Sequence, residues 1–253
     1  MAEQRSVLMS FGGAYSNHIH ALAALGHALN IKTVGLIRGH RPTVLSPTLQ
    51  DAIAWGMQLH FMDKKSFRAQ NLNALPQGLK ALIESQAVHI IPEGGDNLAG
   101  VKGCIAIGRA IAKKVQAPHY TLCSATATGT TLAGLVAGSP KHCKNIGFSV
   151  LKGDDVITQS VQHTLASLAA NNTSFSVKTG FHCGGYANVN DSLIAFMKGF
   201  EQANQLMLEP VYTAKMLLAI EQLALEGYWS AGECIVAVHS GGVQGRRGYK
   251  ELL

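Results

Sequence analysis

Short apolar runs alternate with helical patterns along almost the whole chain. The runs typical of strands are 7–11, 33–37, 59–62, 88–91, 119–123, 145–151 and 234–239. The longest segments with the spacing of amphipathic helices are 17–30, 100–115, 154–171, 191–208 and 211–226. Strands that alternate with helices favour a mostly parallel sheet covered on both faces. We therefore predict an α/β fold with a first α/β region, residues 1–115, that includes a small domain, and a larger domain, residues 116–253.

Proline predicts where two of the helices begin. Ser46 precedes Pro47, which is the pattern of an N-cap followed by proline at the first helical position. The helical pattern over 72–85 contains Pro76, and proline inside a helix removes a hydrogen bond. We therefore expect that helix to begin at Pro76.

Composition excludes several classes of protein. The 253 residues are 47% apolar and 14% charged, which is enough apolar side chain for a substantial core. The net charge is +6, but lysine and arginine are dispersed and no basic stripe with interleaved aromatics is visible, so nucleic acid is not a predicted partner. No apolar stretch is long enough to span a bilayer, and the first residues lack a signal-peptide pattern. We expect a cytoplasmic protein without membrane association.

Cysteine and histidine predict neither a disulfide framework nor a metal site. The 5 cysteines are scattered and no C-x-x-C pair occurs. Of the 11 histidines, His18 and His20 are two positions apart and would face different directions on a helix, and no H-E-x-x-H motif is present. We therefore predict no metal.

The most informative motif is a strand, a glycine turn and a helix start near residue 11. Val7 to Phe11 is apolar, Gly12-Gly13 follows, and helical spacing begins at Asn17. Polar groups at the end of a strand and the start of a helix point into one crevice. The candidate site residues here are Ser16, Asn17 and His18.

A second motif, residues 121–135, runs from a strand through small residues into a helix. Small residues allow backbone N–H groups to approach an anion, threonine hydroxyls add donors, and a helix N-terminus favours negative charge. The candidate phosphate-binding residues are Thr126, Ala127, Thr128, Gly129, Thr130 and Thr131. A tight loop capped by threonine explains the same composition, because neither a Walker motif nor a dinucleotide fingerprint is present. Both interpretations stay open on composition alone.

Four further segments carry glycine or aromatic residues at the ends of predicted elements. They are 92–100, 181–186, 208–215 and 238–245. Taken singly, each is explained as a turn or a helix start, with Asp96 or Asn97 as a cap in the first and Tyr212 as a core residue in the third.

Together, and in this order, these motifs resemble the family of pyridoxal-phosphate (PLP) enzymes that includes 1-aminocyclopropane-1-carboxylate (ACC) deaminase and D-cysteine desulfhydrase. The resemblance implies the fold-type-II architecture that is similar to tryptophan synthase β. Residues 126–134 resemble its phosphate cup, Gly-Thr-Gly-Thr-Thr-Leu-Ala-Gly, with Ala127 in place of the first glycine. Residues 94–97 resemble a Gly-Gly-Ser-Asn segment near the active-site cleft, with Asp96 where serine is common.

The resemblance also implies roles for single residues. Asn17 would bind the PLP 3-oxygen, and Ser16, a candidate catalytic residue, and His18, a candidate substrate-binding residue, would face the substrate carboxylate. Residues 208–215 resemble Asp-Pro-Val-Tyr-(Thr/Glu)-Gly-Lys, so that Tyr212 would act on the substrate.

In that same segment Thr213 would meet the pyridine nitrogen, where a neutral partner leaves the nitrogen unprotonated more readily than a carboxylate would. Tyr186 would lie on the rim of the site and bind substrate. The resemblance implies a homodimer that acts on a small amino acid.

The lysine that binds PLP covalently in this family lies upstream of the first motif, in a Gly-Asn-Lys-x-Arg-Lys-Leu segment. None of the 14 lysines here follows an asparagine in such a context. We therefore expect an N-terminally truncated relative that forms no normal internal Schiff base by itself.

Three functions follow as hypotheses. The first is a PLP-dependent deaminase or lyase that converts an amino acid to a keto acid and ammonia, with sulfide when the substrate is cysteine. Desulfhydration is favoured over ACC ring opening because Thr213, not glutamate, follows Tyr212. The second is an inactive truncated relative that binds a phosphate ligand or a partner chain. The third, a nucleotide-binding protein that uses the 126–131 loop, is weakened by the absence of a nucleotide fingerprint.

Overall fold

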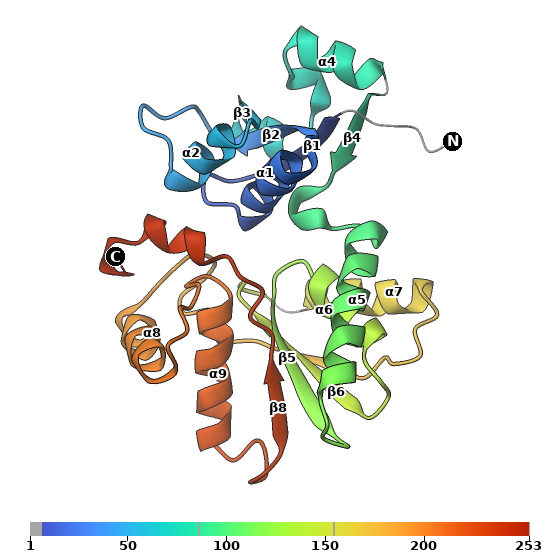
Figure 1. The fold of residues 1–253 in the computed structure, drawn as a ribbon, viewed down its shortest axis with the longest axis vertical. Helices are drawn as coiled ribbons and strands as arrows, with labels where there is room; N and C mark the ends of the chain where they lie inside the picture. Colours follow the sequence, from blue (N-terminus) through green and yellow to red (C-terminus); the bar gives the residue numbers. More distant parts are fainter. Residues whose placement is uncertain (1–6, 86, 154, 253) are drawn as a thin grey trace. The chain divides into compact units, whose positions relative to one another are not determined.

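The computed structural model describes residues 7–85, 87–153 and 155–252, and these form two compact units. Unit 1 contains the described residues up to Gly95 together with Arg247–Glu251. Unit 2 contains Asp96–Arg246 with Leu252. Each unit is an α/β layer structure of its own (Figure 1).

Unit 1 is built on a parallel sheet with strand order β3-β2-β1-β4. The strands are β1 (Val7–Gly12), β2 (Lys32–Arg38), β3 (Gln58–Met62) and β4 (Val88–Ile91). The helices are α1 (Asn17–Leu29), α2 (Pro47–Ala54), α3 (Lys64–Arg68) and α4 (Gln77–Glu84), with 3-10 turns η1 (Leu72–Ala74) and η2 (Glu93–Gly95).

Alternating side chains of β1 pack on opposite faces of this sheet. Met9 and Phe11 join a core under α3 and α4 that includes Phe67 and Leu79. The other face is covered by α1 and α2, whose buried residues include Leu49. The sheet is therefore covered on both sides, as parallel sheets require.

Unit 2 repeats this plan with strand order β7-β6-β5-β8. The strands are β5 (Tyr120–Thr126), β6 (Cys143–Ser149), β7 (Phe175–Lys178) and β8 (Cys234–Ala237). The helices are α5 (Leu98–Lys114), α6 (Thr130–Gly138), α7 (Asp155–Ser167), α8 (Asp191–Asn204) and α9 (Thr213–Leu225), and the chain ends in η3 (Val243–Gly248) and η4 (Lys250–Leu252).

Helices cover both faces of the second sheet as well (Figure 1). Cys123 of β5 packs with Met216 and Ala219 of α9. Its neighbour Leu122 faces the opposite way and packs with Leu135 of α6. The predicted alternation of strands and helices is thus confirmed in both units.

The division between the units falls at Gly95/Asp96, some distance before the boundary drawn at residue 115 from the sequence. The physical reason is the packing of α5 on α6 through glycine. A Cβ atom added to Gly134 would lie 2.3 Å from Cys104 Cβ, and one added to Gly108 would lie 2.7 Å from the Leu135 carbonyl oxygen. Because the two helices approach so closely, α5 belongs to the core of unit 2.

Several element boundaries differ from the sequence patterns. β7 and α3 were not predicted, because both are short and lack a clear period. The predicted helix 191–208 ends at Asn204, since Gln205 adopts a left-handed C-cap with φ 54°. The start of the predicted helix 154–171 at Asp154 lies outside the described residues. Within the described ranges, the longest helix is α5 with 17 residues, and no helix there is long and apolar enough to cross a membrane.

Candidate functional site

The strand order of each unit creates a topological switch point beside its central strand. In unit 1 the chain passes from β1 to β2 on one side, and β4 joins β1 on the other. In unit 2, β5 has β6 on one side and β8 on the other. Ligands of open parallel sheets bind outside the carboxyl ends of the strands at such points. Four of the six motifs singled out in the sequence follow β1, β4, β5 and β8 and lie at the switch point of their own unit, whereas 181–186 follows β7 and 208–215 leads into α9.

In unit 1 the glycine turn brings Ser16 to the start of α1. Ser16 is the N-cap, and its hydroxyl accepts a hydrogen bond from the Ile19 N–H at 3.2 Å. A Cβ atom at Gly12 would lie 2.7 Å from Ser16 Oγ, so glycine permits the tight turn. Asn17 is the first residue of α1, and both Ser16 and Asn17 are half-buried. The structure therefore gives Ser16 a capping role, beside which its predicted catalytic role stays a proposal.

His18 is bound to the sheet through Ser10. His18 Nε2 lies 2.7 Å from Ser10 Oγ, and Ser10 Oγ donates to the Ile91 carbonyl at 2.8 Å. A serine hydroxyl has one proton, so when Ser10 donates to Ile91 it must accept from the Nε2–H of His18. This assigns the tautomer with the proton on Nε2 and leaves Nδ1 as an acceptor. Burial lowers the pKa of His18, which keeps the ring neutral.

The lowered pKa of His18 predicts that acid destabilises unit 1. The unfolded chain takes up the histidine proton near the ordinary pKa of about 6.5, whereas the native chain resists it until lower pH. Stability is therefore lost as the pH falls below about 6.5. We expect wild type to lose more free energy of unfolding than His18→Gln between about pH 7.5 and about pH 5.5 in urea titrations. Glutamine at this position removes the titrating group, and His27→Gln, exposed on the same helix, is the control. Equal losses in wild type and His18→Gln would contradict the prediction.

In unit 2 the loop after β5 forms a cradle of small residues. Gly129 has φ 94°, and a Cβ atom there would lie 2.8 Å from Val161 Cγ2, so only glycine fits. Thr128 Oγ1 and Thr130 Oγ1 are 3.0 Å apart. The N-cap of α6 is Gly129, which supplies no side-chain cap. Ala127 is not among the residues with positive φ, so its methyl group causes no backbone strain.

Thr126 carries a buried hydroxyl at the end of β5 for which the described residues offer no partner. The residue is 3% exposed, and its Oγ1 makes no hydrogen bond. Buried hydroxyls are normally hydrogen-bonded, and leaving one unpaired costs about 1–3 kcal/mol. An acceptor with several oxygens, such as a phosphate monoester, suits this hydroxyl together with those of the neighbouring loop. The donor set of residues 126–130 therefore fits the phosphate of PLP.

The remaining cup candidate, Thr131, faces α5. Burial raises the pKa of the Cys104 thiol, and a hydrogen bond with the Thr131 side chain opposes that rise. Thr131 is half-buried. Its hydroxyl thus bonds the Cys104 thiol of α5, the helix that packs against α6.

Asp96 introduces a carboxylate at the cup that composition did not predict. Thr130 Oγ1 donates a hydrogen bond of 2.5 Å to Asp96 Oδ1. The neighbouring Asn97 is the N-cap of α5, with its side chain accepting from the Gly100 N–H at 2.8 Å. Of the two caps considered from the sequence, Asn97 is therefore the one used.

Tyr186 and Tyr212 are brought together in unit 2. Their hydroxyl oxygens are 3.0 Å apart, and their rings meet edge to face with centroids separated by 5.9 Å. Tyr186 is 49% exposed, so the pair is open to solvent. Two residues predicted from separate motifs thus share one hydrogen bond, and either phenol can be the donor.

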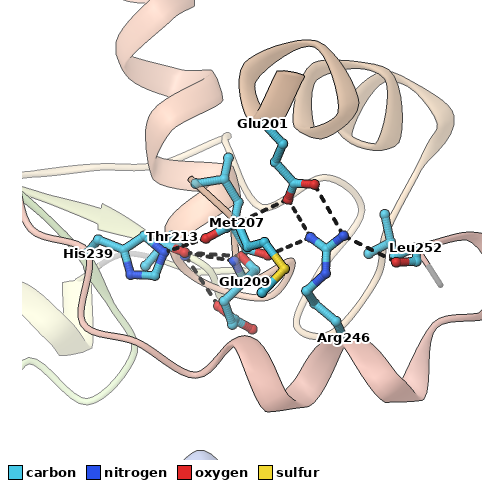
Figure 2. Close-up of polar contacts among 8 residues, drawn as sticks. Glu201, Met207, Glu209, Thr213, His239, Arg246 and Leu252 are labelled. Carbon is cyan, nitrogen blue, oxygen red and sulfur yellow. Dashed lines mark hydrogen bonds and ion pairs between the residues drawn. The ribbon is translucent and has the colours of Figure 1, made fainter. Parts of the chain in front are cut away.

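Thr213, the predicted partner of the pyridine nitrogen, is engaged in the turn that starts α9. It is fully buried, its hydroxyl donates to the Glu209 carbonyl at 3.2 Å, and the same oxygen accepts from the Glu209 N–H at 3.1 Å (Figure 2). The single proton of this hydroxyl is therefore used inside the turn. The role of Thr213 toward the cofactor stays a proposal.

Glu209 is a site-forming residue that the sequence motifs did not single out. Its carboxylate accepts from the N–H groups of Val211 at 2.8 Å and Tyr212 at 2.7 Å, which fixes the start of α9. Burial raises the pKa of Glu209, and the backbone hydrogen bonds partly oppose that rise. The signal was an acidic residue four positions before the first residue of α9, where a carboxylate satisfies unpaired N–H groups.

An ion pair anchors the segment that leads to Tyr212. Arg246 forms a two-point ion pair with Glu201 of α8 and donates to the Leu208 carbonyl at 2.8 Å (Figure 2). Glu201 in turn accepts from the Leu208 N–H at 2.8 Å. His239, which follows β8, makes a 2.9 Å contact with the Met207 carbonyl. Residues 207 and 208 are therefore held by side chains from α8, η3 and the loop after β8.

Lys215 is buried beneath the loop that carries Tyr186. It is 1% exposed, and Nζ donates to the carbonyls of His182 at 2.9 Å and Gly185 at 2.8 Å. Burial lowers the pKa of Lys215, while Cys183 and Glu209 oppose that change. Both hydrogen bonds use the ammonium to position the loop. Over the residues that the structure describes, no cluster of three or more histidine, cysteine or acidic side chains could hold a metal ion.

The chain is similar to known enzymes over nearly its whole length. It is 25% identical over 262 residues to the mitochondrial bifunctional D-cysteine desulfhydrase/1-aminocyclopropane-1-carboxylate deaminase of Arabidopsis thaliana, which covers 96% of this chain and 65% of that relative. It is 24% identical over 260 residues to a D-cysteine desulfhydrase of Klebsiella pneumoniae, with 96% of this chain and 78% of that relative covered. The chain thus spans about two thirds to four fifths of the length of these relatives.

A solved structure confirms the predicted fold. The crystal structure of an ACC deaminase homologue matches with a TM-score of 0.83 and 21% identity, covering 100% of this chain and 80% of that one. A likeness at this identity shows the architecture, which is the fold-type-II arrangement expected from the motifs. The family model described as pyridoxal-phosphate dependent enzyme matches residues 4–241. The chain therefore belongs to the family of pyridoxal-phosphate-dependent enzymes, whose cofactor is the one that the sequence predicted.

Proposed function

We propose that this chain is a PLP-dependent deaminase or desulfhydrase that converts a small amino acid to a keto acid and ammonia, and releases sulfide when the substrate is cysteine. The observation that carries the proposal is the 3.0 Å contact between the hydroxyls of Tyr186 and Tyr212. Paired phenols can hold or move a proton at a bound substrate. Similarity to proteins named D-cysteine desulfhydrase and ACC deaminase supports the same reaction class.

The cofactor, when bound, supplies an electron sink that stabilises negative charge at the substrate α-carbon. In unit 2, the hydroxyls of Thr126, Thr128 and Thr130 and the uncapped start of α6 would hold its phosphate, and Gly129 allows close approach. Tyr212 would then exchange a proton with the substrate, with Tyr186 orienting its hydroxyl.

Residues of unit 1 enter the proposal through the resemblance. Asn17 would bind the 3-oxygen of PLP, and Ser16 and His18 would face the substrate carboxylate. The neutral, Nε2-protonated form of His18 leaves Nδ1 as an acceptor, so His18 would accept a hydrogen bond. The donor to the carboxylate would then have to be Ser16 or an N–H group at the helix N-terminus. His18 would therefore orient a protonated group of the ligand by accepting its hydrogen bond.

We propose desulfhydration ahead of ACC ring opening. Thr213 is a neutral hydroxyl, and its proton is used on the Glu209 carbonyl. A residue in that state cannot protonate the pyridine nitrogen. An unprotonated ring withdraws electrons from the substrate less strongly. Elimination of a good leaving group such as sulfide needs less electron withdrawal than opening a carbon ring.

The test is turnover together with the chemistry of cofactor attachment. The protein is incubated with PLP, scanned by absorbance, reduced with borohydride and mapped by peptide mass. D-cysteine, L-cysteine and ACC are then supplied separately, and keto acid, ammonia and sulfide are measured. A reduced adduct on one lysine together with release of sulfide from a cysteine isomer would support the proposal, and would show that a lysine outside the Gly-Asn-Lys context serves, contrary to the truncation expected from the sequence. Binding of PLP without an adduct and without turnover would contradict the proposal.

One observation favours a second function, a relative that binds a phosphate ligand without catalysis. None of the 14 lysines follows a Gly-Asn pair. Lys215, which follows Tyr212 by less than one helical turn, has its ammonium committed to two carbonyls. In that case pyridoxine 5′-phosphate, which has no aldehyde, would bind as tightly as PLP, because no covalent bond would contribute.

Assembly as a homodimer stays a prediction from the resemblance. Light scattering of the purified chain across a range of concentrations tests it. A mass of twice 26.8 kDa would support the dimer, and a monomer at all concentrations would contradict it.

A further inference from the structure

We propose that Asp96 is an affinity-determining residue of the phosphate cup, whose carboxylate competes with the ligand phosphate for Thr130. The inference rests on the proposed function, because it assumes that residues 126–130 receive a phosphate monoester. It goes beyond that function because it gives the Asp96 carboxylate a role in weakening phosphate binding at Thr130.

The bond to Asp96 occupies the hydroxyl proton of Thr130. Thr130 Oγ1 donates to Asp96 Oδ1 at 2.5 Å, which lies at the short end of hydroxyl–carboxylate bonds. Such charge-assisted bonds are about twice as strong as neutral ones. A threonine hydroxyl has one proton, so Thr130 cannot donate to a phosphate while it donates to Asp96. Its oxygen is also 3.0 Å from Thr128 Oγ1, so the carboxylate perturbs two of the threonine hydroxyls of the cup.

Asp96 also competes with a phosphate through its negative charge. Thr130 is the first residue of α6, and the N-terminus of that helix favours negative charge. Asp96 places a carboxylate where a phosphate would gain the same stabilisation. Two anions at one helix start repel each other, so the carboxylate must move before a phosphate dianion binds.

Burial does not hold Asp96 in the cup. The residue is exposed, and among the described residues no ion pair involves it. It follows Gly94 and Gly95, which both have φ 70°. Displacement into water would leave no buried charge behind, so the carboxylate lowers affinity for phosphate without abolishing binding.

The experiment measures binding of pyridoxine 5′-phosphate by calorimetry to wild type, Asp96→Asn and Asp96→Ser. This probe has no aldehyde, so its affinity does not depend on any lysine. Inorganic phosphate is measured in parallel. The control is Asp191→Asn, an exposed aspartate of the same unit, which changes the net charge equally.

We expect both Asp96 variants to bind the probe about ten- to a hundredfold more tightly than wild type, which corresponds to one hydrogen bond with a charged partner. Asp191→Asn should match wild type. In a Thr130→Val background the gain from Asp96→Asn should shrink, because the shared hydroxyl is gone. Inorganic phosphate should follow the same order.

Tight and equal binding by wild type and both Asp96 variants would overturn the inference and leave the proposed function intact. An equal gain in Asp191→Asn would also overturn it, because only net charge would then matter. Failure of every variant to bind the probe or phosphate would overturn the inference together with the phosphate role of the cup.

Discussion

Replacing Tyr212 with phenylalanine is expected to lower kcat of the PLP-loaded protein by about a hundredfold or more, since positioned proton donors contribute roughly that factor. The hydroxyl of Tyr212 lies 3.0 Å from that of Tyr186, and phenylalanine keeps the edge-to-face ring contact while removing the proton. Tyr186→Phe should reduce kcat less, because it removes only the hydrogen-bond partner. Keto acid release under saturating substrate is the measurement.

The matched control for both tyrosines is Tyr228→Phe. Tyr228 is 46% exposed and its ring meets that of Trp229 edge to face, so it supplies the same chemical change outside the pair. We expect its kcat to equal wild type. Binding of pyridoxine 5′-phosphate should be unchanged in all three variants. Full activity of Tyr212→Phe would contradict its assignment as the proton-transfer residue.

Replacing Arg246 with alanine is expected to destabilise unit 2 by about 3 kcal/mol, the cost of breaking a largely buried ion pair by removing one partner. The side chains of Arg246 and Glu201 are 14% and 19% exposed. Loss of the guanidinium also leaves the Leu208 and Leu252 carbonyls without their donor. Urea unfolding measures the change.

Two further variants separate the ion pair from general effects of losing arginine. Arg246→Lys should recover only part of the stability, because an ammonium cannot make the two-point contact with Glu201. Arg109→Ala, exposed on α5, should stay close to wild type. If Arg246→Ala proved as stable as Arg109→Ala, the anchoring role of the pair would be wrong. Residues 207–209 lead into Tyr212. We therefore also expect the turnover of Arg246→Ala to fall at least as much as its folded fraction does.

Much of the fold was predictable because it depends on local patterns. Pro76 interrupts the 72–85 pattern and predicts a helix start there, and α4 begins one residue later, at Gln77, with Pro76 as its N-cap, since proline cannot donate to a helix interior. Ser46 is the N-cap of α2, with its hydroxyl accepting from Leu49 as the Ser-Pro pattern indicated. β7 was missed because a strand of four residues with mixed burial has no readable period.

The candidate site was predictable where a motif is contiguous. The loop at residues 126–131 and the turn at residues 12–18 each contain their own glycine, their own hydroxyls and the start of a helix. The pairing of Tyr186 with Tyr212 spans separate segments, and the resemblance, not the spacing, suggested both. The short bond between Asp96 and Thr130 was outside any pattern, because the two residues are 34 positions apart.

By itself the sequence determined the α/β class, the order of the strands and helices that have a readable period, and the glycine turns, because strand and helix periods and positive φ angles act within a few residues. Only the tertiary structure decided which polar groups share protons: His18 with Ser10, Thr130 with Asp96, and Glu201 with Arg246. Hydrogen bonds and ion pairs depend on distances of a few ångström between segments, and those distances are set when the sheet order and helix packing bring distant residues together.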